Sequence, residues 1–178
     1  MTSSPGRIEP PLRADEATTL RAFLDYHRDT LRWKTSGLSA AQLDTPLAPS
    51  TMTLGGLVKH LAYVESNWCS VVLAGHDPLP PFDTADWGQD RDWDWHSAAA
   101  DSPEELRGTY DRTVAAADRL LDAALARDGL ETLSAREDRH GGGRFTVRWI
   151  LTHLVEEYAR HNGHADLLRE SIDGSTGE

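Results

Sequence analysis

The chain has 178 residues, a formal net charge of −11 and 39% apolar residues. This length fits one domain with its own core, so folding requires neither a disulfide nor a metal. The acidic charge would repel phosphate backbones and argues against nucleic-acid binding. No apolar run approaches the roughly 20 residues of a membrane span, so we expect no membrane partner.

The two ends and the cysteine content limit the class of protein further. Residues 1–11 lack the apolar stretch of a secretory signal, so we expect a cytoplasmic protein. We expect a single domain over residues 1–178, with residues 1–11 and 174–178 as flexible tails. The one cysteine, Cys69, excludes an internal disulfide and a cysteine-cluster zinc site, and we expect its thiol to be buried.

Apolar residues at helical spacing predict the first two long helices. The first spans about residues 15–36 and ends at Gly37. One helical turn is expected at residues 39–43, before two prolines break the chain. The second long helix begins after the N-cap Thr53 and ends near Gly75.

The third long helix has the clearest boundary in the chain. Ser102 can cap it, Pro103 suits its first position, and Glu105 completes a capping box. Its apolar stripe continues to Leu125, and Gly129 follows its end.

The fourth long helix begins after the glycine run 141–143, with Thr146 as its cap, and ends at about Ile172, before Gly174. Four amphipathic helices of about twenty residues predict an all-α fold, an antiparallel four-helix bundle.

Two long connections join these helices. Residues 75–101, here called the tryptophan segment, hold three tryptophans: Trp87, Trp93 and Trp95. Because exposing so much aromatic surface is unfavourable, we expect this segment to be ordered over one end of the bundle. It is either a lid over a ligand pocket or a plug that seals the bundle. The second connection, residues 128–145, is expected to be a flexible flap.

Polar side chains interrupt the core face of the fourth helix. Glu157 and His161 share this face with Ile150 and Leu154. An uncompensated buried carboxylate costs several kcal/mol, so it should be protonated, paired or bound to a cation. Residues four apart lie about 5 to 6 Å from each other, which lets Glu157 and His161 chelate one ion.

His60 supplies a third ligand from the second helix, where it faces the interior beside Leu57 and Leu61. Two histidines and one glutamate with an open fourth position form a known catalytic zinc arrangement. Zinc is therefore the first candidate for the divalent metal, and nickel, iron and manganese are alternatives.

Plainer interpretations stay open. Glu157 can pair with Arg148 or Arg160, while His60 and His161 are ordinary core histidines. His153 and His164 lie toward one edge of the same face. They are either solvated imidazoles or catalytic groups beside the metal, as general bases or as partners of the ligands.

Several segments resemble one known family. They are residues 148–164 (RWILTHLVEEYARHNGH), 53–61 (TLGGLVKHL), 31–34 (LRWK) and 92–96 (DWDWH). Together the chain is similar, over nearly its whole length, to the DinB/YfiT-like superfamily of four-helix metal-binding proteins, in its mycothiol-dependent branch.

The resemblance implies a ligand set of His60, Glu157 and His161. Most members of the superfamily use one histidine and an H-x-x-x-H pair. Here Glu157 is the first member of the pair, which resembles the set of mycothiol-dependent maleylpyruvate isomerases. A carboxylate is a harder ligand than an imidazole, so the exchange of histidine for glutamate leaves open which metal the site prefers.

Three functions follow as hypotheses. The leading one is a metalloenzyme that binds a small thiol, mycothiol by resemblance, as a thiolate and transfers it to a small electrophilic substrate or isomerises that substrate. The second is a metal-dependent hydrolase of a small molecule, with water at the open position. The third is a non-catalytic helical binding or dimerisation module, for which a homodimer is expected.

Overall fold

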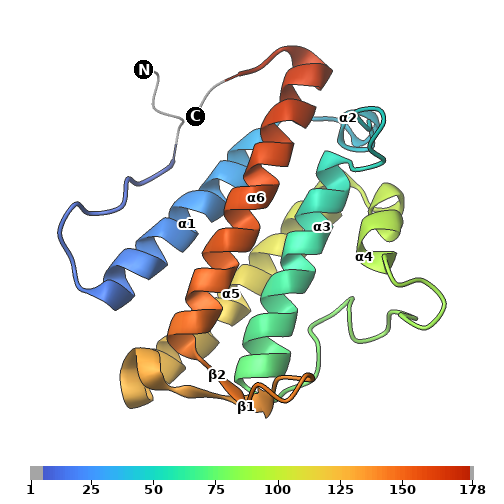
Figure 1. The fold of residues 1–178 in the computed structure, drawn as a ribbon. Coiled ribbons are helices and arrows are strands. Elements are labelled where there is room, and N and C mark those ends of the chain that lie inside the picture. Colours follow the sequence, from blue (N-terminus) through green and yellow to red (C-terminus); the bar gives the residue numbers. More distant parts are fainter. Residues whose placement is uncertain (1–5, 177–178) are drawn as a thin grey trace.

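The computed structural model describes residues 6–176, and it is mainly helical, as the sequence predicts (Figure 1). The predictions for residues 1–5 and 177–178 lie outside the described residues. The long helical segments are α1 (Glu16–Thr35), α3 (Leu54–Glu65) with its continuation η1 (Ser66–Leu73), α5 (Pro103–Asp128) and α6 (Val147–Asp173). The short elements are α2 (Ala40–Leu43), α4 (Trp93–His96), η2 (Ser97–Ala100), η3 (Gly129–Glu131), β1 (Leu133–Glu137) and β2 (Arg144–Thr146).

The long helices begin where the capping residues predict. The side chains of Asp15, Thr53, Ser102 and Thr146 each accept a hydrogen bond from a backbone N–H in the first turn. Such caps satisfy donors that have no partner within the helix, so they fix where each helix starts. Around Ser102 both halves of the predicted capping box are present.

The four long helical segments lie side by side (Figure 1). α1 packs against α6, and α3 packs against α5 and α6. In Figure 1, α6 lies between α1 and α3, with α5 behind them. Leucine is the commonest residue of the interior, and Leu24, Leu57, Leu61, Leu121 and Leu154 are fully buried.

The second connection is not the flexible flap that the sequence suggests. It contains an antiparallel pair of strands, β1 and β2, whose register pairs Leu133 with Thr146 and Glu137 with Arg144. Gly141 and Gly143 adopt φ values of +81° and +89°, which glycine accepts without strain. The glycine run therefore forms the turn of a small hairpin, and the rest of the fold is mainly helical, consistent with the predicted all-α class.

The second long helix reaches Leu73, close to the predicted end, but changes geometry on the way. From Ser66 it is a π-helix, and the amide of Ala74 donates to the carbonyl of Cys69 at 3.1 Å, five residues back. Cys69 itself is completely buried, as expected. Burial raises the pKa of its thiol well above the usual value, so the thiol stays protonated.

The tryptophan segment lies along α3 rather than over an end of the helices (Figure 1). It contains two short helices, α4 and η2, and its three tryptophans are partly buried against the core. Within the described part of the chain, no helix combines the length and apolar character needed to cross a membrane.

A buried ion pair joins the long helices at the centre. The guanidinium of Arg28 (α1) donates to both oxygens of Glu65 (α3) at 2.7 and 2.8 Å, and the two residues are only 1% and 0% exposed. The hydroxyl of Tyr158 (α6) donates to Glu65 at 3.0 Å, and that of Tyr110 (α5) lies 2.8 Å from Tyr158. Burial raises the pKa of both tyrosines, so they remain neutral donors.

Candidate metal centre

His60 from α3 and Glu157 and His161 from α6 come together in the structure. One ligand atom of each lies within 4.8 Å of the others, and we call this set the triad. The Nε2 atom of His161 is 3.5 Å from Oε2 of Glu157, and the rings of His60 and His161 have their centroids 4.9 Å apart. His161 is buried and the other two are half-buried. Two imidazoles and a carboxylate at this spacing suit a divalent ion.

Neither arginine that the sequence offered as a partner contacts Glu157. Arg148 binds Glu16 and Glu131 instead, and Arg160 binds Glu156. Among the described residues, the polar contacts of the Glu157 carboxylate are with the imidazoles of His153 and His161. Because burial lowers the pKa of His161, its neutral imidazole does not compensate this half-buried carboxylate, whereas a cation does.

His60 is held by two side chains of the tryptophan segment. Its Nδ1 atom lies 2.7 Å from Oδ2 of Asp94, whose side chain is 4% exposed. The ring of Trp95 stacks on the His60 ring, with centroids 4.5 Å apart and planes 23° from parallel. Asp94 is not among the residues predicted from the sequence, because nothing in the DWDWH motif distinguishes it from the exposed Asp92.

The electrostatics of His161 favour a neutral ring. Burial lowers its pKa to about 4, with further contributions from His60 and His164. An imidazole must be neutral to bind a metal, so His161 is in the required state at neutral pH.

His164 contacts the ring nitrogen of His161 that does not face Glu157. The Nδ1 atoms of the two rings are 3.3 Å apart, so one of them donates to the other. If the lone pair of His161 is on Nε2, which faces Glu157, its proton is on Nδ1 and is donated to His164.

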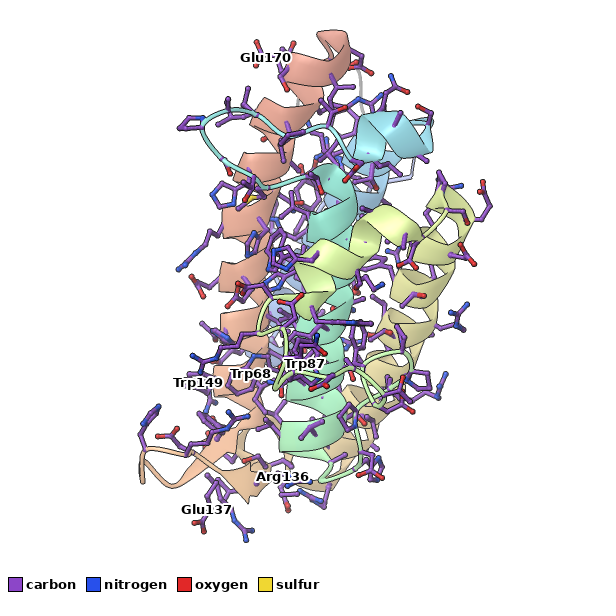
Figure 2. The ribbon with its side chains drawn as sticks, turned by 90° about the vertical axis from the view of Figure 1, so that its right-hand side faces the viewer. Trp68, Trp87, Arg136, Glu137, Trp149 and Glu170 are labelled. Carbon is purple, nitrogen blue, oxygen red and sulfur yellow. The ribbon has the colours of Figure 1, made fainter. Side chains whose placement is uncertain are left out.

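His153 borders the other oxygen of Glu157. Its Nε2 atom is 3.5 Å from Oε1 of Glu157, and its ring lies against Trp149 and Trp68 with centroids 5.0 and 4.7 Å away. Figure 2 shows Trp68 and Trp149 side by side at this place. His153, Glu156 and Glu157 form a second group of three close ligand atoms, although Glu156 is exposed and bound to Arg160.

A cavity of about 440 Å³ opens beside Trp95. Its polar lining consists of Asp44, Ser50, Thr51, Thr53, Asp92 and His96. Trp95 both borders this cavity and stacks on His60, so its ring connects the cavity to the triad, although none of the three triad residues lines the cavity.

Gly56 allows Trp95 to approach α3 closely. A Cβ atom at Gly56 would lie 2.8 Å from Cε3 of Trp95. We therefore expect Gly56→Ala to destabilise the protein by about 1–3 kcal/mol through overpacking.

The matched control is Gly163→Ala in α6, where a Cβ meets nothing within 4 Å. That change should stabilise the protein by up to about 1 kcal/mol through helix propensity. Urea unfolding of both variants measures the difference, and equal effects would contradict the close contact.

Comparisons with known proteins show the family and the fold of the chain. A family model described as mycothiol-S-transferase matches residues 19–174. No curated protein matches the chain. A crystal structure of a conserved protein from Enterococcus faecalis is 19% identical, with a TM-score of 0.61, and the match covers 92% of this chain and 100% of that one. That likeness shows a shared fold alone. The family match confirms the resemblance to the mycothiol-dependent branch of the DinB/YfiT-like superfamily, and the chain belongs to the mycothiol-S-transferase family.

Proposed function

We propose that the chain is a metal-dependent enzyme that transfers mycothiol, as its thiolate, to a small electrophilic molecule. The observation that carries this proposal is the convergence of His60, Glu157 and His161 from two helices, with ligand atoms within 4.8 Å. Membership of the mycothiol-S-transferase family supports the thiol as the cofactor. We also propose that α1, α3, α5 and α6 form the antiparallel four-helix bundle expected from the sequence.

Zinc is the first candidate for the ion, because two histidines and one carboxylate leave a fourth position open. When bound, a divalent ion supplies one thing: it keeps a coordinated thiol deprotonated, whereas a free thiol with a pKa of about 8.5 is mostly protonated at neutral pH. The residues of the chain supply the rest. His161 is held neutral by burial, and His60 and His161 are oriented through their Nδ1 atoms.

The cavity beside Trp95 is our candidate for the binding place of the thiol and substrate. Its hydroxyls and carboxylates, among them those of Thr51, Asp44 and Asp92, can bond to a hydroxylated ligand. The apolar part of the lining consists of Met52, Trp95 and Ala99, so the cavity is lined mostly by polar residues, which suits a hydroxylated ligand.

The proposed reaction conserves atoms and charge. The S–H bond of the thiol breaks, a C–S bond forms at the electrophilic carbon, and the leaving group departs with the electron pair of its bond. The proton released from sulfur ends on the leaving group or on water. His153 and His164 border the triad, so they are our candidates to carry this proton in between.

The test uses the full chain, stripped of metal and reloaded with cobalt(II). We expect mycothiol to produce a sulfur-to-cobalt charge-transfer band, and the zinc-loaded protein to form the S-conjugate of an alkyl halide, detected by mass spectrometry. Glu157→Ala should lose both signals. The control variant His140→Ala changes an exposed histidine that is not part of the triad, so it should keep both signals.

Two other results would each reject the proposal in a defined way. A cobalt spectrum that ignores thiols, together with hydrolysis of ester or amide substrates, would favour the hydrolase hypothesis. A wild-type protein that stays empty after incubation with zinc, nickel and manganese would favour a binding module.

A further inference from the structure

The tryptophan segment binds to one stripe of α3. Gly56, Lys59, His60 and Tyr63 are spaced three and four residues apart, so they lie on one face of the helix. Trp95 lies against Gly56 and His60, Trp93 lies under the ammonium of Lys59 at 4.6 Å, and Trp87 packs on Tyr63 with ring centroids 4.6 Å apart. Figure 2 looks onto this side, where α4 crosses in front of α3.

A polar contact is buried within this apolar docking surface. Asp94 is only 3% exposed, yet its carboxylate lies against a single imidazole nitrogen, Nδ1 of His60, at 2.7 Å. A second ion pair, between Lys59 and Asp101 at 2.6 Å, fixes the following part of the segment to the same helix. The segment is thus bound to α3 on both sides of Asp94, through Trp93 before it and Asp101 after it.

We propose that Asp94 is a positioning residue for the metal ligand His60, and that docking of the tryptophan segment and metal binding at the triad stabilise each other. This inference rests on the metal site of the proposed function. It makes the segment a structural part of that site instead of a lid or a plug.

The chemistry of the contact supports this role. A neutral imidazole that donates its Nδ1 proton to a carboxylate has its lone pair on Nε2, the nitrogen that remains for the ion. The carboxylate also makes the ligand nitrogen more basic and fixes the angle of the ring. Stacking against Trp95 restrains the same ring from its face, so Asp94 and Trp95 together define where Nε2 points.

The coupling must act in both directions. If docking of Asp94 improves the affinity for the ion, then the bound ion favours the docked segment by the same factor. A purely structural Asp94 would stabilise the metal-free fold equally and would give no such coupling.

The first experiment measures zinc affinity of the full chain by competition with a chromophoric chelator. We expect Asp94→Ala to bind zinc about 10 to 100-fold more weakly than wild type, as is usual when the partner of a ligating histidine is lost. Asp94→Asn keeps an acceptor oxygen without the charge, so its loss should be smaller. The matched control is Asp90→Asn, which removes a carboxylate from the same segment, 2.9 Å from Nδ1 of the exposed His96. It should leave the affinity unchanged.

The second experiment tests the reciprocal effect. Zinc should slow proteolytic cleavage within residues 83–92 of the wild-type protein, and the ratio of rates with and without zinc should shrink in Asp94→Asn. This ratio compares each variant with itself, so an overall loss of stability does not imitate the result.

The outcomes separate this inference from the proposed function. If Glu157→Ala loses zinc while Asp94→Ala binds it as tightly as wild type, the inference is wrong and the metal site stands. If wild type binds no metal, the proposed function fails first. If zinc protects wild type and Asp94→Asn equally, the coupling is refuted.

Discussion

Replacing Glu65 by alanine is expected to reduce the free energy of unfolding by about 3–5 kcal/mol. The change removes the carboxylate that accepts two hydrogen bonds from Arg28 and one from Tyr158. The guanidinium of Arg28 is 1% exposed, so water cannot replace the lost partner. Asp118 still contacts Arg28 at 2.8 Å, which compensates only part of the buried charge. Denaturation by urea, followed by circular dichroism, measures the loss.

Two further variants test whether the loss of stability arises because the ion pair is buried. Glu104→Ala breaks an exposed ion pair with Arg107 and should cost less than about 1 kcal/mol. The double variant Arg28→Met with Glu65→Leu removes both charges and should recover most of the stability that Glu65→Ala loses. Equal effects of Glu65→Ala and Glu104→Ala would show that the buried pair contributes no more than a surface pair.

The second large effect concerns the metal. His60→Ala and His161→Ala should each weaken zinc binding by more than about 100-fold, because losing a direct ligand should exceed the 10 to 100-fold typical of an outer partner. His153→Ala should change the affinity by less than about 10-fold, since its ring lies 3.5 Å from only one oxygen of Glu157. Chelator competition with the three variants compares these affinities directly.

The zinc affinities of these variants also show which of two groups of ligands, both containing Glu157, holds the ion. One is the triad, and the other is formed by His153, Glu156 and Glu157. If His153→Ala loses zinc while His60→Ala keeps it, the ion occupies the second group, and the triad is not the metal site.

Local spacing explains why part of the site could be predicted. Glu157 and His161 are four residues apart on one helix, so their proximity follows from helix geometry alone. His60 required one further step, the expectation that its helix faces the fourth. Asp94 could not be found in this way, because its contact with His60 depends on the path of the chain through residues 61–93, for which no spacing rule exists.

The spacing of Glu65 and Arg28 in the sequence indicates that both side chains are buried. Glu65 follows Leu57 and Leu61 by eight and four residues, and Arg28 follows Leu24 by four, so both charges lie on apolar faces. Apolar character alone is a poorer guide here, because Phe23 on the same helix is 44% exposed. A charge at core spacing on each of two helices indicates a pair, but the sequence does not say which charges meet.

The hairpin was missed for a different reason. Its strands have five and three residues, too short for an alternating pattern to stand out. What orders them is contact with neighbours that are distant in sequence, such as the guanidinium of Arg136 donating to the carbonyl of Val71 at 3.3 Å. The glycine run correctly indicated a break in the helices, but it did not distinguish a turn from a flap.

The proposed function, which involves reactive electrophiles, requires that the protein's own thiol does not react with them. Such compounds alkylate accessible thiolates without regard to which molecule carries them. The chain has one cysteine, and its thiol is fully buried and kept protonated. Under the proposed function, this thiol would neither compete with the thiol cofactor for substrate nor form a mixed disulfide with that cofactor. An enzyme with that function would therefore be protected from inactivation by its own reactants.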